Sequence, residues 1–147
     1  MNLKLRRTQR SGGMLGNKVY FALDARADLT GEERSLVQKY ALGKLVVYDS
    51  EARKARNESI QAHLAEAQTA SAGRSLWKTA QGLANLAAAA LTLRITVDSL
   101  TGGEHVECKS LDELLGAETA IVESCRNLKA YLETALTFDG REEVLEF

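Results

Sequence analysis

The sequence predicts an α+β protein, with one mixed or antiparallel sheet of about six strands and helices packed on one face. Three observations predict it: segments in which apolar and polar residues alternate, capping boxes that open helices, and glycine-containing turns between strands. The chain has 147 residues, of which 45% are hydrophobic and 27% charged, values typical of one soluble globular domain. We therefore expect a single α+β domain over residues 1–147.

The N-terminal residues predict a β-hairpin. Leu3 and Leu5 alternate with cationic residues as far as Arg10, a period of two that is typical of a half-buried strand. Glycines 12, 13 and 16 then interrupt the pattern, and a second alternating segment runs from about Lys18 to Arg26. Strand, glycine-rich loop and strand together indicate a hairpin.

A helix and a third strand follow the hairpin. Thr30 and Glu33 form a capping box, in which each side chain accepts a hydrogen bond from an unpaired backbone N–H group. We expect this helix to end at Gly43, because glycine favours the position just after a helix. The apolar residues of segment 44–48 do not alternate with polar ones, which predicts a strand buried on both faces.

Residues 50–90 predict a pair of helices. The first, from Glu51 to about Ala70, has a thin apolar stripe and should be mostly exposed. The second runs from about Ser75 to Ala90 and carries Trp77 near its start. Such a helix can lie on a membrane surface with its tryptophan at the interface. It has few cations after Lys78, so we favour core packing or a partner groove and mark Trp77 as an interaction residue.

The last third predicts strand, strand, helix and strand. Segments 91–100 and 105–109 alternate, a capping box at Ser110 opens a long helix to about Leu136, and a final strand covers residues 143–147. The long helix carries a single apolar stripe: Leu111, Leu114, Leu115, Ile121, Val122, Cys125, Leu128, Leu132, Ala135 and Leu136.

The two ends of the chain resemble each other in pattern. Residues of about 1–49 and 91–147 each predict a β-β-α-β unit, and the helical connector of about 50–90 joins them. Each unit opens with an alternating strand that ends in a Ser-Gly-Gly or Thr-Gly-Gly turn. Convergence of two hairpins on the same turn chemistry is the alternative to a duplication.

The loop between the first two strands does not match a phosphate-binding loop. A Walker A loop has four residues between its glycines and then Lys-Ser/Thr. Here three residues separate Gly12 from Gly16, and Asn17 precedes Lys18. We interpret the segment as a hairpin loop.

The segment His105-Val106-Glu107-Cys108 contains the His-x-Glu pattern of zinc deaminases. That chemistry also needs a Pro-Cys-x-x-Cys motif, and the chain contains no proline. On a strand, His105 and Glu107 share one face while Cys108 points to the other. We interpret the segment as a structural strand and expect neither a metal site nor a cofactor.

Glu118 is the polar residue inside the apolar stripe of the long helix. It lies between Leu115 and Val122 on the helical wheel, where an unpaired buried charge would be costly. One hypothesis is an acid–base residue of an enzyme, with a pKa raised by burial. We favour a structural pair with an arginine or lysine, or a helix side that reaches solvent.

Charge is distributed unevenly along the chain. Residues 1–97 hold 15 Lys and Arg against 8 Asp and Glu, whereas residues 98–147 hold 4 against 12. The halves therefore carry +7 and −8, a pattern that suggests self-association or a basic binding surface. The basic cluster Lys4, Arg6, Arg10 and Lys18 is a candidate phosphate track for nucleic acid or another anion. A solvated face, or a face that meets the acidic half of another copy, is the alternative.

These observations favour a non-enzymatic interaction or accessory protein that forms a homodimer, with a possible protein partner. The opposed charge supports this hypothesis, as does a final strand that carries Phe147, because an edge strand must be covered, charged or paired. Nucleic-acid binding through the basic hairpin is the second hypothesis, and an enzyme using Glu118 is the third. With two cysteines and no apolar segment after Met1, we expect a cytoplasmic protein without a membrane span.

Overall fold

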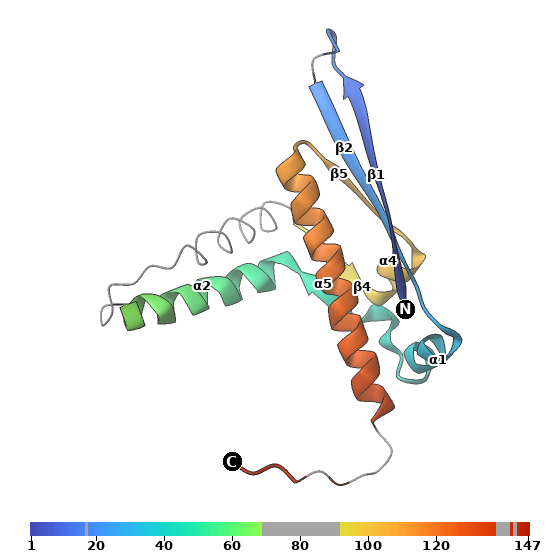
Figure 1. Cartoon of the computed structure of the whole chain (residues 1–147), viewed down its shortest axis with the longest axis vertical. Coiled ribbons are helices and arrows are strands. Elements are labelled where there is room, and N and C mark those ends of the chain that lie inside the picture. The colour runs from blue at the N-terminus through green and yellow to red at the C-terminus, as the bar shows by residue number, and fades with distance from the viewer. Residues whose placement is uncertain (17, 69–91, 138–141, 143) are drawn as a thin grey trace.

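Figure 1 shows the computed structural model, in which one long helix lies across a sheet while a hairpin and a second helix extend outward. The structure describes residues 1–16, 18–68, 92–137, 142 and 144–147. Its elements are β1 (Asn2–Gly12), β2 (Lys18–Asp28), α1 (Gly31–Lys39), the 3₁₀ turn η1 (Leu42–Lys44), β3 (Val46–Asp49), α2 (Ser50–Gln68), β4 (Arg94–Thr96), α4 (Val97–Gly102), β5 (Glu104–Cys108) and α5 (Leu111–Leu136). The mixed α+β class predicted from the sequence is confirmed.

The described strands form two small antiparallel sheets, so the prediction of one sheet of about six strands is not confirmed. One sheet has the order β1-β2-β5, and the other pairs β3 with β4. A single cluster of buried apolar residues joins both sheets to α5. The side-chain amide of Asn127 on α5 adds a direct link, since its Nδ2 donates a hydrogen bond to the Val47 carbonyl at 2.7 Å.

The predicted hairpin is confirmed. β1 and β2 pair from Asn2↔Asp28 to Gly12↔Lys18, and Gly13 and Gly16 adopt positive φ in the turn. The alternation of β2 is real, because Leu23, Ala25 and Ala27 are buried while their neighbours reach the other face. β5 pairs only with residues 21–25, so the hairpin extends beyond the rest of the sheet (Figure 1).

The helix after the hairpin begins as predicted and ends earlier. Thr30 and Glu33 form the expected reciprocal capping box of α1. The left-handed residue after the helix is Ala41, not Gly43. Gly43 has a different role, because a Cβ atom there would lie 2.6 Å from the Oδ1 atom of Asp98. The glycine permits a close approach between η1 and α4.

The predicted strand at 44–48 and the exposed helix after it are both confirmed. Val47 and Tyr48 are consecutive and both buried, which accounts for the lack of alternation in β3. The Oδ1 atom of Asp49 then accepts hydrogen bonds from the backbone N–H groups of Glu51 and Ala52, which caps α2. α2 leaves the body of the molecule, and Ile60 on it is half exposed (Figure 1).

The predicted strand at 91–100 is wrong over its second half. β4 covers only residues 94–96, and α4 follows at once. The reason is a capping box, because the Thr96 and Ser99 side chains each accept a hydrogen bond from the other residue's backbone N–H group. Val97 and Leu100 are both buried at helical spacing, so an apolar pattern that fits a strand also fits a helix here.

α5 begins near its predicted capping box. The Ser110 hydroxyl accepts from the Glu113 backbone as expected, but the Glu113 carboxylate accepts from the N–H of Lys109 instead of that of Ser110. The helix buries one side against β2, β3 and β5. Its largest fully buried side chains include Ile121 and Leu128.

The predicted final strand is not found. Residues 142 and 144–147 form no strand, so the second unit does not repeat the β-β-α-β order of the first. Its first strand is also shortened by α4, and its β4 pairs with β3 of the other unit. The second connector helix, with Trp77, lies outside the described residues.

Candidate interaction surface

The strand register places the predicted basic cluster on one face of the three-stranded sheet. Lys4, Arg6 and Arg10 of β1 lie opposite Arg26, Asp24 and Tyr20 of β2, the residues that alternate with the buried ones. Lys18 continues the same alternation on β2. The sharing of a face that the period of two predicted is therefore confirmed, and its role in binding stays a prediction.

Carboxylates share this face with the cations, and the sequence did not predict them there. Nζ of Lys4 lies 2.5 Å from Oδ2 of Asp28, and Nη2 of Arg10 lies 3.6 Å from Oε1 of Glu107. The hydrogen bond from Lys4 lowers the pKa of Asp28. The face therefore carries charges of both signs, because β2 contributes Asp28 and β5 contributes Glu107. The exposed ion pairs are weak, so their cations can exchange partners.

The His105 and Glu107 segment forms the structural strand that the sequence predicted. Nδ1 of His105 lies 2.5 Å from Oδ1 of Asp24, and this hydrogen bond raises the pKa of the imidazole. Cys108 is buried on the opposite face. No group of three metal-ligating side chains occurs in the part of the chain that the structure describes.

β1 forms one edge of its sheet. It pairs with β2 over eleven residues, and no described strand lies along its other side. An edge strand presents backbone N–H and carbonyl groups to any extended segment that approaches it. Cations protect such edges against indiscriminate pairing and favour an acidic partner strand.

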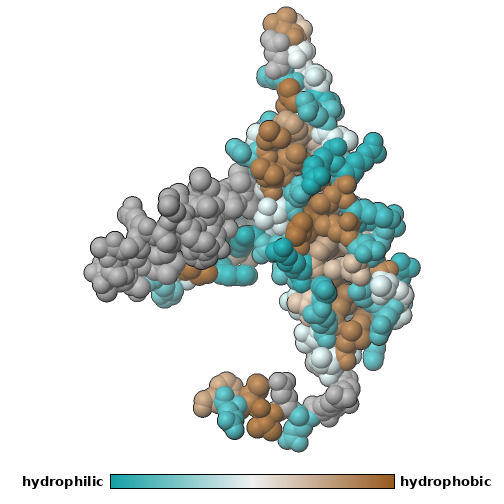
Figure 2. All heavy atoms as spheres, viewed as in Figure 1, coloured by the Kyte–Doolittle hydropathy of each residue, from teal (hydrophilic) through white to brown (hydrophobic). Residues whose placement is uncertain are grey.

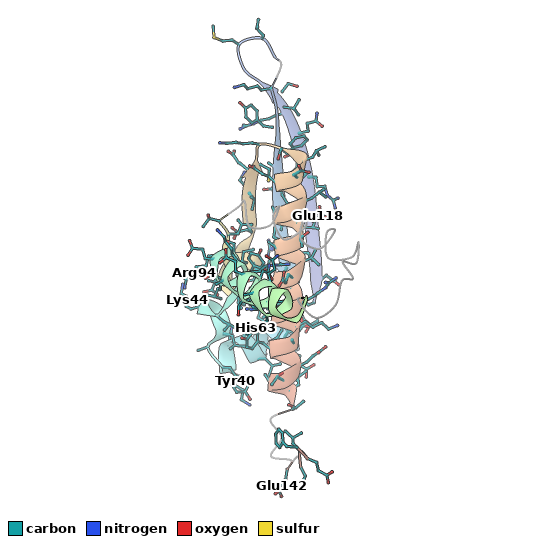
Figure 3. The ribbon with its side chains drawn as sticks, turned by 90° about the vertical axis from the view of Figure 1, so that its left-hand side faces the viewer. Tyr40, Lys44, His63, Arg94, Glu118 and Glu142 are labelled. Atoms are coloured by element: carbon teal, nitrogen blue, oxygen red, sulfur yellow. The ribbon has the colours of Figure 1, made fainter. Side chains whose placement is uncertain are left out.

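Arg7 of β1 points to the opposite face from Arg6 and binds Glu118 of α5. Nε of Arg7 donates to Oε2 at 2.8 Å, and Nη2 donates to Oε1 at 2.5 Å. The pair lowers the pKa of Glu118, the direction opposite to that of a desolvated general acid. The structural pairing that we favoured is therefore confirmed, and Figure 3 marks its place on α5. In the sequence, Arg7 continues the alternation of Leu3 and Leu5, which indicates that it shares their face of the strand.

One flank of α5 is apolar and uncovered. The predicted stripe is too wide, because Leu111 and Leu115 are each 60% exposed and Leu136 is 51% exposed. Figure 2 shows apolar side chains along the visible face of the body, interrupted by charged ones. The first two leucines lie on the same half of α5 as Glu118, the residue that binds Arg7 of β1. Strand edge and helix flank together form what we call the docking surface: β1 with Leu111 and Leu115.

Two further sets of apolar residues are exposed to solvent. Met14 and Leu15 form the tip of the hairpin. Val144, Leu145 and Phe147 belong to the segment after α5, and Phe147, a predicted interaction residue, has no contact that buries it. Figure 3 places Glu142 beyond the C-terminal end of α5, away from the sheet.

Among the described helices, none is long and apolar enough to cross a membrane. No protein-family model matches the chain, and neither the curated proteins nor the solved structures include one that is significantly similar to it.

Proposed function

We propose that the protein is a non-enzymatic interaction protein that forms a homodimer, in which residues 142–147 of each copy bind along β1 of the other. One observation carries the proposal: a basic, eleven-residue edge strand and an acidic, apolar, uncovered segment occur in the same chain. Main-chain hydrogen bonds to the free edge would supply affinity, as in other cases of strand addition.

The side chains of the two partners are complementary. In an extended segment, Val144 and Glu146 point to one side while Leu145 and Phe147 point to the other. Val144 and Glu146 would lie beside the cations of β1, where Glu146 meets Arg6 or Arg10. The second pair would lie on the α5 side, where exposed apolar side chains can bury it.

Pairing of β1 with a second β1 is disfavoured. Antiparallel pairing centred on Arg7 would place Lys4 opposite Arg10 of the other copy, and like charges directly opposite each other destabilise a sheet. An acidic strand avoids this repulsion. The overall split of +7 and −8 between residues 1–97 and 98–147 favours the same reciprocal exchange of C-terminal segments.

We place the dimer in the cytoplasm. Cys108 and Cys125 are both free and buried, and burial raises the pKa of each thiol. Free thiols without activation suit a reducing compartment.

Nucleic-acid binding by the hairpin is the second candidate, favoured by the apolar tip beside cations. Within the described residues, Arg6 and Lys18 have no ion-pair partner. Met14 and Leu15 resemble the apolar wedges that some minor-groove proteins insert between base steps. Binding of a duplex that weakens with salt and is lost in Arg6→Ala/Arg10→Ala would support this candidate.

Light scattering at low ionic strength tests the dimer. The full chain should have twice the mass of one 16.0 kDa copy, and Leu145→Asp/Phe147→Asp should have the mass of one. Ile60→Asp is the control, since this half-exposed residue of α2 lies outside the docking surface and should leave the dimer intact. A full chain that stays monomeric at every concentration, for example because the segment binds β1 of its own copy, contradicts the proposal.

A further inference from the structure

A cleft in the described part of the chain is lined by residues that do not belong to the docking surface. It has a volume of about 670 Å³ and is bounded by β3, β4, the first turns of α2 and the middle of α5. Its charged lining comes from Asp49, Arg53, Arg56, Arg94 and Glu123. Figure 3 shows Arg94 beside the start of α2. The volume falls in the range of roughly 300–1,000 Å³ that small-molecule sites occupy.

The carboxylates of the cleft are already engaged. Asp49 caps α2 through two backbone N–H groups. Glu123 forms an ion pair with Arg53, whose guanidinium also lies over the ring of Tyr48. The remaining cations, Arg56 and Arg94, have no ion-pair partner among the described residues. The three guanidinium groups and two carboxylates leave the lining with a net positive charge.

One further feature marks this cleft as a site. Tyr48 lines the cleft, and its buried hydroxyl has no hydrogen-bond partner among the described residues. A buried hydroxyl without a partner is uncommon in native proteins, and a bound water or ion is one explanation for it.

We propose that this cleft binds a small molecule through a phosphate group, held by Arg56 and Arg94. Planar guanidinium groups donate two parallel hydrogen bonds to an oxyanion, and phosphate has enough oxygens to accept from two of them. A phosphate polymer needs a continuous basic track, which the engaged carboxylates of this cleft interrupt. The site does not depend on the proposed dimer, because none of these residues belongs to the docking surface.

Isothermal titration of the full chain with pyrophosphate tests the site. We expect binding that weakens with added salt, and a loss of at least tenfold in affinity in Arg94→Gln and in Arg56→Gln. Lys54→Gln is the matched control, since it removes one exposed charge from α2 outside the cleft and should bind as the parent does. Far-ultraviolet circular dichroism of each variant shows that it is folded, and either arginine variant alone suffices if the other unfolds.

A second experiment distinguishes a soluble phosphate ligand from the headgroup of a membrane lipid. Sedimentation with phosphatidylcholine vesicles that contain phosphatidic acid presents the same group on a membrane. Vesicle binding that Arg94→Gln abolishes, in a chain that does not bind pyrophosphate, would assign the arginines to a lipid surface and overturn the small-molecule site. Absence of pyrophosphate binding, or an equal loss of affinity in Lys54→Gln, would also overturn it.

Discussion

Arg7 on β1 and Glu118 on α5 are 111 residues apart in sequence and are joined by two hydrogen bonds, at 2.8 and 2.5 Å. The pair connects the edge strand to the helix that carries the exposed Leu111 and Leu115. Because the Glu118 side chain is 23% exposed, the pair resembles a surface salt bridge more than a buried one.

Glu118→Gln should therefore lower the free energy of unfolding by under about 1 kcal/mol. The folded pKa of Glu118 lies below its ordinary value of 4.5, so the stabilisation is present above that value and is lost as the pH falls through the folded pKa. Urea denaturation at neutral pH and in acid measures the difference. A variant that is more stable than the parent at neutral pH would show that the Glu118 carboxylate destabilises the folded chain. Such a result would favour the enzyme hypothesis, because active-site residues often lower stability.

His105 should titrate above its ordinary pKa of 6.5, because the hydrogen bond from the imidazole to Asp24 stabilises the charged ring. The contribution to stability is fully present below the unfolded pKa and is lost as the pH rises through the folded pKa. Proton NMR of the imidazole measures the value directly. Asp24→Asn should lower it, whereas Asp98→Asn, a control on α4 outside this pair, should leave it unchanged.

Leu128→Ala and Leu136→Ala compare two leucines of the same helix. Leu128 is completely buried, so its truncation should cost about 2–5 kcal/mol by leaving a cavity. Leu136 is half exposed, and its truncation should change the stability of the monomer far less. Denaturation of both variants in urea tests the observed boundary of the apolar stripe, and similar losses would place Leu136 in the core after all.

Tyr48→Phe should raise stability in the absence of a ligand. Removal of a buried hydroxyl without a partner avoids a desolvation cost of about 1–3 kcal/mol, and the ring keeps its packing. Thermal unfolding without added phosphate measures the change. A clear loss of stability would mean that the hydroxyl has a partner in the folded chain.

The elements that could be predicted are those whose signals are local. The Thr30 and Glu33 capping box, the hairpin and the doubly buried Val47 and Tyr48 each depend on neighbouring residues, and the structure has all three. The alternation through Val97 predicts a strand as far as Leu100, although the capping box of Thr96 and Ser99 opens a helix there. A local pattern that satisfies two periods does not decide between them.

Relationships between distant segments were harder to predict. The period of two placed Lys4, Arg6 and Arg10 on one face, but the carboxylates beside them come from strands that only the fold brings together. The cleft is lined by both Arg56 of α2 and Arg94 of β4. No pattern in the sequence between these two arginines predicts that they line the same cleft. The exposed leucines of α5 followed the predicted helical stripe, and only packing shows which part of the stripe is covered.

Light scattering of two charge-reversed variants tests the proposed dimer most directly. Lys4→Glu/Arg6→Glu/Arg10→Glu leaves Arg7 as the one cation of β1, so the edge strand and segment 142–147 are then both acidic. Glu142→Lys/Glu143→Lys/Glu146→Lys gives a chain in which both are basic. Each variant alone should have the mass of a single 16.0 kDa copy at low salt, since like charges meet at both contacts. An equimolar mixture should have twice that mass, because each segment then meets an edge of opposite charge. A mixture that stays monomeric while the parent chain dimerises would contradict the account.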